Sequence, residues 1–479
     1  MKTASKSFAY SFKDLSIHRD IGTEKATLFY TMYSDYIFIF ISLLGFPMKF
    51  TSKTEAYIPP GTTIASKRAT FQAAMKLTVV IGQFFGLNPV QGVCEIDASR
   101  LRFSFFSWRT FYSMLSICGQ SFIFGLCLIN LFEGTNAISS NTSLVFNGLN
   151  GWTTLMFFRI AMLWPKLCQF IAKTEAADPC LDDKLTKRCN ALCLLILSLA
   201  LLEHLLSIVA ALATVLDCQP DRDVYEGFVT NSYPFISYVT YNIFYGVLTQ
   251  LLNIQCTFNW NFANIFVICV SFYLTSRLNQ INGRINAIRG TYVPTSFWRS
   301  VREDYSRLTY LVKRIDDVIS GIIFVSFANN LFFICLQLLH TLEGGIKASP
   351  LCHEGTDNRP LGGYEQAVYF VYSFGFLVLR SLAVSLILSN VHSASRKPIF
   401  ALYDVDTTSY CIEVQRFIEQ IHGDNIALTG LQFFSVKRGI VLSIISESPV
   451  KLGPTIWKIY PREFRNSRRN SKLLLLFFS

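Results

Sequence analysis

Residues 424–448 read DNIALTGLQFFSVKRGIVLSIISES, and this stretch decides how the membrane helices of the chain end. It opens polar, carries Lys437 and Arg438 side by side, and becomes apolar over residues 439–445. A membrane-spanning helix needs about 20 mostly apolar residues. The pattern therefore predicts a last membrane helix that begins near Gly439 and stays incomplete, followed by an atypical basic tail over residues 449–479.

The composition of the whole chain is that of a membrane protein. Of its 479 residues 51% are hydrophobic and only 16% are charged, whereas a soluble domain has about 25% charged residues. The mean hydropathy is +0.36, and the apolar residues form long uninterrupted runs. We therefore expect an all-α polytopic membrane protein. The net charge of +11 does not indicate nucleic-acid binding, because the basic residues lie in loops between the apolar runs.

Six complete apolar segments predict membrane spans, and together they form a transmembrane domain over residues 110–448. The predicted spans are residues 110–132, 144–164, 190–216, 253–276, 315–342 and 364–390. The incomplete segment near Gly439 would be the seventh. Residues 235–252 are also apolar, but Tyr, Thr and Asn are scattered through them, so we expect part of a long outer loop that packs on the bundle.

Residues 1–109 form a mixed N-terminal region. The first 20 residues lack the apolar core of a cleavable signal peptide. Residues 75–93 are apolar but are interrupted by Gln83 and by Asn88-Pro89. This segment predicts an interfacial or re-entrant helix, and the alternative is a true span.

Loop charges predict that the N-terminus is cytoplasmic. Sixteen Lys and Arg residues lie in segments 94–109, 165–189 and 277–314, against three in the alternating loops 133–143, 217–234 and 343–363. The glycosylation signal at Asn141 falls in a loop predicted to be outside. Seven complete spans would then leave the C-terminus outside, which is the reverse of a G-protein-coupled receptor. Most cysteines lie inside apolar runs, but Cys218 and Cys352 fall in outer loops and are candidates for a disulfide.

Several sequence blocks resemble one family in consistent order from about residue 71 to residue 443. The N-terminal block is QFFGLNPV at residues 83–90, and residues 101–103 and 108–113 resemble the basic run into the first span. Residues 252–258 and Trp260 resemble the entry to the fourth span. The strongest block contains Glu413, Arg416, Phe417, Thr429, Gly430, Phe433 and Phe434. In these blocks the chain resembles the insect gustatory receptors, and among them the sugar-sensing, trehalose-receptor-like branch.

The resemblance implies a ligand-gated, non-selective cation channel in the plasma membrane of taste neurons. It implies seven membrane helices, assembly as a homo- or hetero-tetramer with other gustatory receptors, sugars as ligands and contact with membrane lipid. The pore would be lined by the seventh helix, and the cytoplasmic ends of the fourth to seventh helices would form an anchor domain that includes the strongest block. No cofactor, metal or nucleic acid is implied.

The chain departs from the family after about residue 444. The family's Thr-Tyr, five apolar residues, Gln-Phe segment, which completes the seventh helix, has no counterpart here. Two interpretations compete: an incorrect 3′ end with a missed final exon, which we favour, and a genuine truncated isoform. As written, the basic tail is expected to stay in the cytoplasm. We expect a chain without its pore helix not to conduct as a homomer.

Ionisable residues inside predicted spans are costly and mark candidate functional sites. Glu203 and His204 lie in the middle of the third span, and Arg380 lies in the sixth. Glu203 and Arg380 are candidates for an ion pair. Such a pair has two interpretations: it locks two helices together, or it forms the floor of a ligand pocket and couples that pocket to the gate.

A sugar site needs amide and carboxylate partners and an aromatic face against the ring. Asn330 and Gln337 in the fifth span are candidate amides, and Trp152, Tyr369 and Tyr372 are candidate aromatics. The alternative is that these aromatics belong to the interfacial belt and that Asn329 and Asn330 hydrogen-bond between helices.

Enzyme signatures are absent from the sequence, which has no phosphate-binding loop, GxSxG, HExxH or paired CxxC, and its histidines lack metal-ligand spacing. The leading hypothesis is a sugar-responsive receptor subunit. The alternatives are a regulatory, non-conducting subunit and a receptor for a tastant other than sugar. A secondary transporter would show inverted repeats between its halves, and we see none.

Overall fold

The computed structural model describes residues 70–95, 97–132, 138–218, 223–238, 241–344 and 363–439. All of them belong to one compact unit, Thr62–Ser479. The first half of this unit contains α3 (Phe71–Phe84), η1 (Ala98–Arg100), α4 (Trp108–Phe132), α5 (Ile138–Ala177), α6 (Leu185–Cys218), α7 (Val224–Ser232) and η2 (Pro234–Tyr238). The second half contains α8 (Ile243–Ala287), α9 (Thr295–Gly344), α10 (Glu365–Arg396), α11 (Pro398–Tyr403), α12 (Ile412–Gly423), β1 (Thr429–Gly430) and β2 (Phe434–Ser435).

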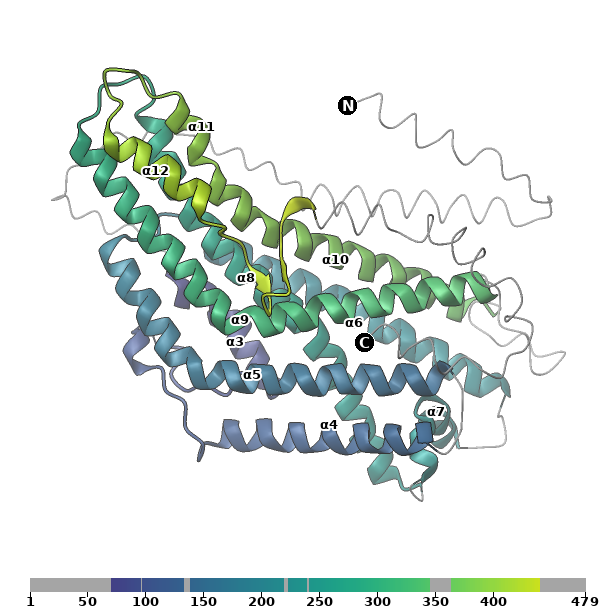
Figure 1. Ribbon diagram of the computed structural model, residues 1–479. Helices are drawn as coiled ribbons and strands as arrows, with labels where there is room; N and C mark the ends of the chain where they lie inside the picture. Colours follow the sequence, from purple (N-terminus) through teal and green to yellow (C-terminus); the bar gives the residue numbers. More distant parts are fainter. Residues whose placement is uncertain are drawn as a thin grey trace, which may run out of the picture. The chain divides into compact units, whose positions relative to one another are not determined.

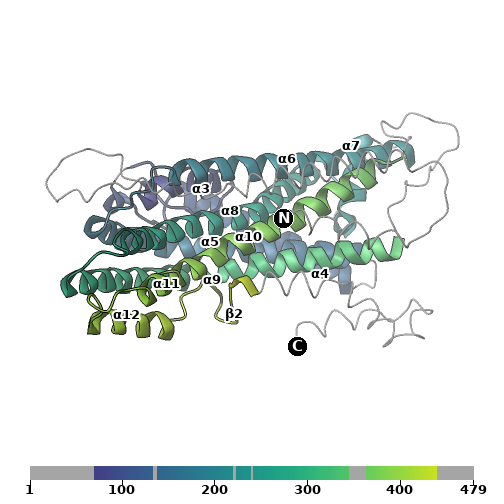
Figure 2. The ribbon, with the colours of Figure 1, turned by 90° about the horizontal axis from the view of Figure 1, so that it is seen from above.

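Six helices of the described chain are long and apolar enough to cross a membrane: α4, α5, α6, α8, α9 and α10. They coincide with the six complete spans that the sequence predicts, so the predicted all-α membrane fold is confirmed. Figures 1 and 2 show these long helices running side by side. The expected incomplete seventh helix falls almost entirely on residues 440–479, which lie outside the described residues.

The helices extend well beyond the predicted spans, and two loop predictions are wrong for this reason. α5 begins at Ile138, so Asn141 lies in its first turn rather than in a loop. α8 begins at Ile243, so residues 243–252 of the predicted loop belong to a membrane helix. Residues 235–238 of that predicted loop belong to η2. Hydropathy detects the part of a helix that lipid surrounds, whereas backbone hydrogen bonds continue a helix into water or against protein.

α8 is the central helix of the bundle. In its most apolar stretch 89% of the residues are buried, whereas in the most apolar stretch of α6 only 17% are buried. α8 packs against α3, α4, α5, α6, α9 and α10. α6 is therefore largely exposed to lipid on its Leu-rich face, and α8 is buried on nearly every side.

The short helix α3 docks on α8 where the sequence predicts an interfacial or re-entrant helix. Thr70 caps its start, and its first N–H donates to the Glu175 carboxylate at 2.8 Å. α3 ends at Phe84 because Gly86 and Asn88 both have positive φ angles, of 78° and 49°. At 14 residues it is too short to span a bilayer, so an interfacial or re-entrant position remains our prediction.

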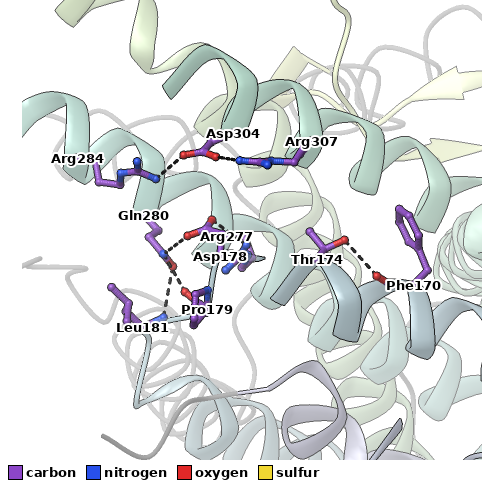
Figure 3. A network of polar contacts seen from close by, with 10 residues as sticks. All are labelled: Phe170, Thr174, Asp178, Pro179, Leu181, Arg277, Gln280, Arg284, Asp304 and Arg307. Carbon is purple, nitrogen blue, oxygen red and sulfur yellow. Dashed lines mark hydrogen bonds and ion pairs between the residues drawn. The ribbon is translucent and has the colours of Figure 1, made fainter. Parts of the chain in front are cut away.

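A polar network ties the C-terminal ends of α5 and α8 to the first turns of α9 (Figure 3). Arg277, only 2% exposed, pairs with Asp178 at 2.9 Å. Gln280 donates to Asp178 and to the Pro179 carbonyl. One turn further along α8, Arg284 pairs with Asp304 of α9 at 2.8 Å. These bonds fix the C-terminal part of α8 against the end of α5 and the start of α9.

Cys218, at the end of α6, is disulfide-bonded. Its predicted partner Cys352 lies outside the described residues. Among the described residues, the other cysteines of α4, α5, α6, α8 and α9 are free. This is expected for small apolar side chains in a membrane bundle.

The first prediction concerns the contact between α3 and α8. A Cβ at Gly82 would come within 2.5 Å of the Phe262 ring, which is fully buried. We expect Gly82→Ala to cost about 1–3 kcal/mol of overpacking, against a gain of about 1 kcal/mol in helix propensity. The thermal unfolding midpoint of the purified protein should fall. Gly125→Ala is the control, because nothing lies within 4 Å of a Cβ there; equal midpoints for the two variants would contradict this account.

Candidate ligand-binding site

Three buried asparagines of α8 bond to three different helices. Asn259 donates to Thr154 of α5 at 3.0 Å. Asn261 accepts from Arg380 of α10. Asn264 accepts from Ser326 of α9 at 2.6 Å. All three asparagines are fully buried, so α8 is fixed in rotation by polar contacts in the middle of the bundle.

Arg380 lies at the centre of the candidate site. It is 1% exposed, and its guanidinium stacks over Trp260 with 4.5 Å to the ring centroid and over Phe376 with 5.1 Å. A desolvated cation over a tryptophan face is stabilised by about 2 kcal/mol. The charge is therefore balanced by the Asn261 amide and two aromatic faces.

The indole of Trp260 is held from its other side by an amide chain. Its Nε1–H donates to Asn330 Oδ1 at 3.1 Å, and Asn330 Nδ2 donates in turn to Asn264 Oδ1 at 3.1 Å. Asn330 thus joins the site, as the sequence predicts. Its neighbour Asn329 is buried with an unpartnered Oδ1.

A second polar chain joins α6, α9 and α10. Gln337 donates to Ser373 at 3.2 Å, and Ser373 donates to the Glu203 carboxylate at 2.6 Å. Tyr369 lies one helical turn before Ser373 on α10, and the Tyr372 hydroxyl donates to the Leu199 carbonyl at 3.0 Å. The structure thus brings together four of the side chains that the sequence singles out: Glu203, Gln337, Tyr369 and Tyr372.

The candidate ion pair between Glu203 and Arg380 does not form. Neither has the other within ion-pair distance, although Coulomb attraction acts between them. Each bonds to a neutral side chain instead, Ser373 in one case and Asn261 in the other. Two opposite charges are therefore held in one bundle without neutralising each other directly.

Two predicted residues take no part in these two hydrogen-bonded networks. Trp152 is 50% exposed on α5 and makes no ring contact among the described aromatics. His204 is half-buried on α6, next to Glu203, and its Nε2 has no hydrogen-bond partner in the described chain.

The block that the resemblance assigns to an anchor lies on α12 and on the hairpin that follows it. Glu413 at the start of α12 accepts from Arg302 of α9 at 2.8 Å and from Arg416 at 2.9 Å. These arginines lower the pKa of the Glu413 carboxyl, with the Arg302 hydrogen bond as the main cause. Phe417 is fully buried against Tyr305, with 5.2 Å between ring centroids.

A β-hairpin, which the sequence does not predict, follows α12 and lies on α9 (Figure 2). Thr429 donates its N–H and its hydroxyl to the two oxygens of Asp316, at 2.7 and 2.6 Å. Phe434 packs on Phe327 with ring centroids 5.3 Å apart. Gly430 is required here, because a Cβ would lie 2.4 Å from the Phe434 ring.

The turn of this hairpin holds two residues other than glycine in the left-handed region, Leu431 at φ 49° and Gln432 at φ 64°. Such residues cost about 1–3 kcal/mol each unless the surroundings hold them. The Leu431 N–H donates to the Ser320 carbonyl of α9, which helps to hold the turn. Phe433 next to it is 79% exposed but touches Phe324, with ring centroids 5.7 Å apart.

The model of the family described as trehalose receptor matches residues 62–447. The chain belongs to this family, the sugar-sensing branch of the insect gustatory receptors. A *Drosophila melanogaster* relative, gustatory receptor for sugar taste 64f, is 32% identical over 399 residues, which cover 82% of this chain and 80% of the relative. Gustatory receptor 5a for trehalose, from the same organism, is 30% identical and covers 78% of this chain and 82% of the relative.

The fold of this receptor is also similar to a solved structure. The olfactory receptor OR5 of *Machilis hrabei*, solved in complex with eugenol, superposes with a TM-score of 0.57 at 12% identity, over 81% of this chain and 98% of OR5. The resemblance predicted from the sequence is therefore confirmed for the family and the fold. The receptor is a multi-pass protein of the plasma membrane, and the relatives it matches are named as receptors.

Several residues of the site were not singled out from the sequence: Asn261, Asn264, Ser326 and Ser373. The segment NWNFAN at residues 259–264 carried a usable signal. Three amides within six residues of an apolar span are too costly to face lipid, so this segment had to face other helices.

The second prediction tests the charge on Glu413. Because its pKa lies below the ordinary value of 4.5, its carboxylate stabilises the fold above about pH 4.5, and this contribution is lost as the pH falls through the lowered value. Glu413→Gln should lower the unfolding midpoint at pH 7, and the gap to the unmodified receptor should close towards pH 4. Glu303→Gln, at an exposed pair 3.8 Å from Arg299, serves as control. A gap that stays constant with pH would contradict the assignment.

The third prediction concerns the attachment of the hairpin to α9. Thr429→Val keeps the shape of the side chain but leaves one oxygen of Asp316 without its donor, which costs about 1–3 kcal/mol. The unfolding midpoint should fall, and limited proteolysis after α12 should become faster. Thr429→Ser retains the hydroxyl and should behave as the unmodified receptor; a fall as large as that of the valine variant would show that the methyl group, rather than the hydrogen bond, matters.

Proposed function

We propose that the receptor is a subunit of a ligand-gated, non-selective cation channel that responds to carbohydrates in taste neurons. Its membership of the trehalose receptor family supports this, as do relatives named for sugar taste and for trehalose. The subunit works in a homo- or hetero-tetramer with other gustatory receptors, with residues 396–439 as part of its cytoplasmic anchor. It has no catalytic role of its own.

The observation that carries the proposal is the unused hydrogen-bonding capacity at the centre of the bundle. Arg380 Nε, Gln337 Oε1 and Asn329 Oδ1 are buried and have no partner in the described chain. Buried polar atoms are normally paired, and a sugar offers many hydroxyls that both donate and accept.

A sugar bound among α6, α8, α9 and α10 would bridge the charges of Glu203 and Arg380. Glu203 and Arg380 belong to two separate hydrogen-bonded networks, and no hydrogen bond between described residues joins these networks. A ligand that bonds to both favours whichever arrangement of the four helices brings the chains into reach, which is a population shift. The proposed site thus consists of Glu203, Asn330, Gln337, Tyr369 and Arg380, with Tyr372 and His204 at its edge.

The fourth prediction tests this site. Ser373→Ala removes the donor that orients Glu203, and a hydrogen bond to a charged group contributes about 1.5 kcal/mol. In cells that also express a second sugar receptor of the family, the sugar concentration for half-maximal current should rise about tenfold, with surface expression unchanged. Ser198→Ala is the matched control, because that exposed hydroxyl bonds only to its own helix, at the Leu194 carbonyl. Equal dose–response curves for the two variants would overturn the site.

Recordings of the receptor alone and together with a second sugar receptor of the same family separate the candidate roles. Sugar-evoked current that carries the Ser373→Ala shift identifies a sensing subunit. Current that the chain only suppresses identifies the regulatory, non-conducting alternative, and responses to non-sugar tastants identify a different ligand class.

A further inference from the structure

A groove of about 510 Å³ lies between the end of α3 and the start of α4. Val80, Ile81 and Phe84 of α3 line it with apolar side chains, and Gln83 and Arg109 supply its polar edge. We propose that this groove binds an anionic phospholipid of the inner leaflet, with the phosphate at Arg109 and an acyl chain along Val80 and Phe84.

The polar edge of the groove is held in place before any ligand binds. The Val90 carbonyl, which is fully buried, accepts from Gln83 Nε2 at 2.6 Å and from Arg109 Nη1 at 2.7 Å. Gln83 also donates to the Asn88 carbonyl at 3.1 Å. One guanidinium nitrogen therefore fixes the orientation of Arg109, and its remaining N–H groups are left for a ligand.

Arg109 lies where a lone cation is unfavourable. It is the second residue of α4, and the positive end of the helix dipole opposes a cation in the first turn. Among the described residues it has no carboxylate partner. The two acids nearby in the sequence are engaged elsewhere, Glu95 with Arg100 at 3.3 Å and Asp97 with Ser99. An anion is thus the missing partner.

The surroundings indicate that this anion comes from lipid. Phe84 and Trp108 are both 77% exposed, and Phe106 is fully exposed. Exposed aromatics of this kind occupy the headgroup level of a bilayer. In the orientation predicted from the loop charges, this end of α4 faces the cytoplasmic leaflet, where anionic lipids gather.

The groove also has the right form for a lipid rather than a soluble anion. Its apolar wall on α3 continues directly to the exposed ring of Phe84, and the Tyr112 hydroxyl of α4 donates to the Phe84 carbonyl at 3.3 Å. A phosphate without an acyl chain would contact only the Arg109 edge and leave that wall in water.

The experiment, which gives the fifth prediction, measures lipid binding to the purified full chain by native mass spectrometry, with phosphatidylinositol, phosphatidylserine and phosphatidylcholine. One arginine at an anionic surface gives about a fivefold preference. We expect that preference for either anionic lipid over phosphatidylcholine in the unmodified receptor, and a ratio near one in Arg109→Gln. Arg109→Lys keeps the charge and should retain most of the preference, which separates a charge effect from misfolding.

Two further arms test the position of the lipid. Val80→Gln, at a partly exposed side chain of the apolar wall, should weaken binding of all three lipids, while Arg100→Gln, an exposed arginine outside the groove, should change nothing. Soluble glycerophosphoinositol should not bind. Equal binding of charged and neutral lipids, a preference that survives Arg109→Gln, or lipid binding that appears only after deletion of residues 1–61 would each overturn the proposal; the last would show that the chain itself covers the groove.

Discussion

The receptor depends on the hydrogen bonds that three amides make in the middle of one buried helix. Asn259, Asn261 and Asn264 of α8 have no access to water, and an unpaired buried amide costs about 1–3 kcal/mol. Successive residues of a helix are about 100° apart, so the three side chains leave α8 in different directions, towards α5, α10 and α9. Pairing all of them at once fixes the rotation and the depth of α8, and the helices that pack on it are fixed with it.

This arrangement explains how a cation is kept in the bundle without an acid beside it. Arg380 is held by an amide that α8 places and by the face of Trp260, which lies between two of the asparagines. Glu203 is held separately through Ser373. Direct neutralisation of the two charges would favour one packing of α6 against α10 whether or not a ligand is bound. Because the two charges are held apart, a polar ligand that bonds to both is able to favour one packing of α6 against α10 over another.

The sequence predicts much of the fold, because membrane spans and loop charges are local properties of the chain. All six complete spans and the short helix before them follow from apolar runs and their interruptions. The ends of α5 and α8 do not, since hydropathy reports contact with lipid rather than helix formation. The partners of Arg380 and the hairpin do not follow from apolar runs either. Asp316 lies 113 residues from Thr429, and the left-handed turn is formed by Leu431 and Gln432, which carry no turn signal.

α3 links the surface of the receptor to this central helix. Gly82 of α3 lies against the Phe262 ring. The opposite face of α3 presents Val80 and Phe84 to the groove beside α4. Phe262 follows Trp260 by two residues on α8, and the same stretch carries the amides that hold Arg380. A lipid seated in the groove therefore contacts a helix that itself packs against α5, α6 and α8. Since packed interiors transmit small shifts rather than absorb them, occupancy of the inner leaflet site would bias the packing around the site proposed for sugar.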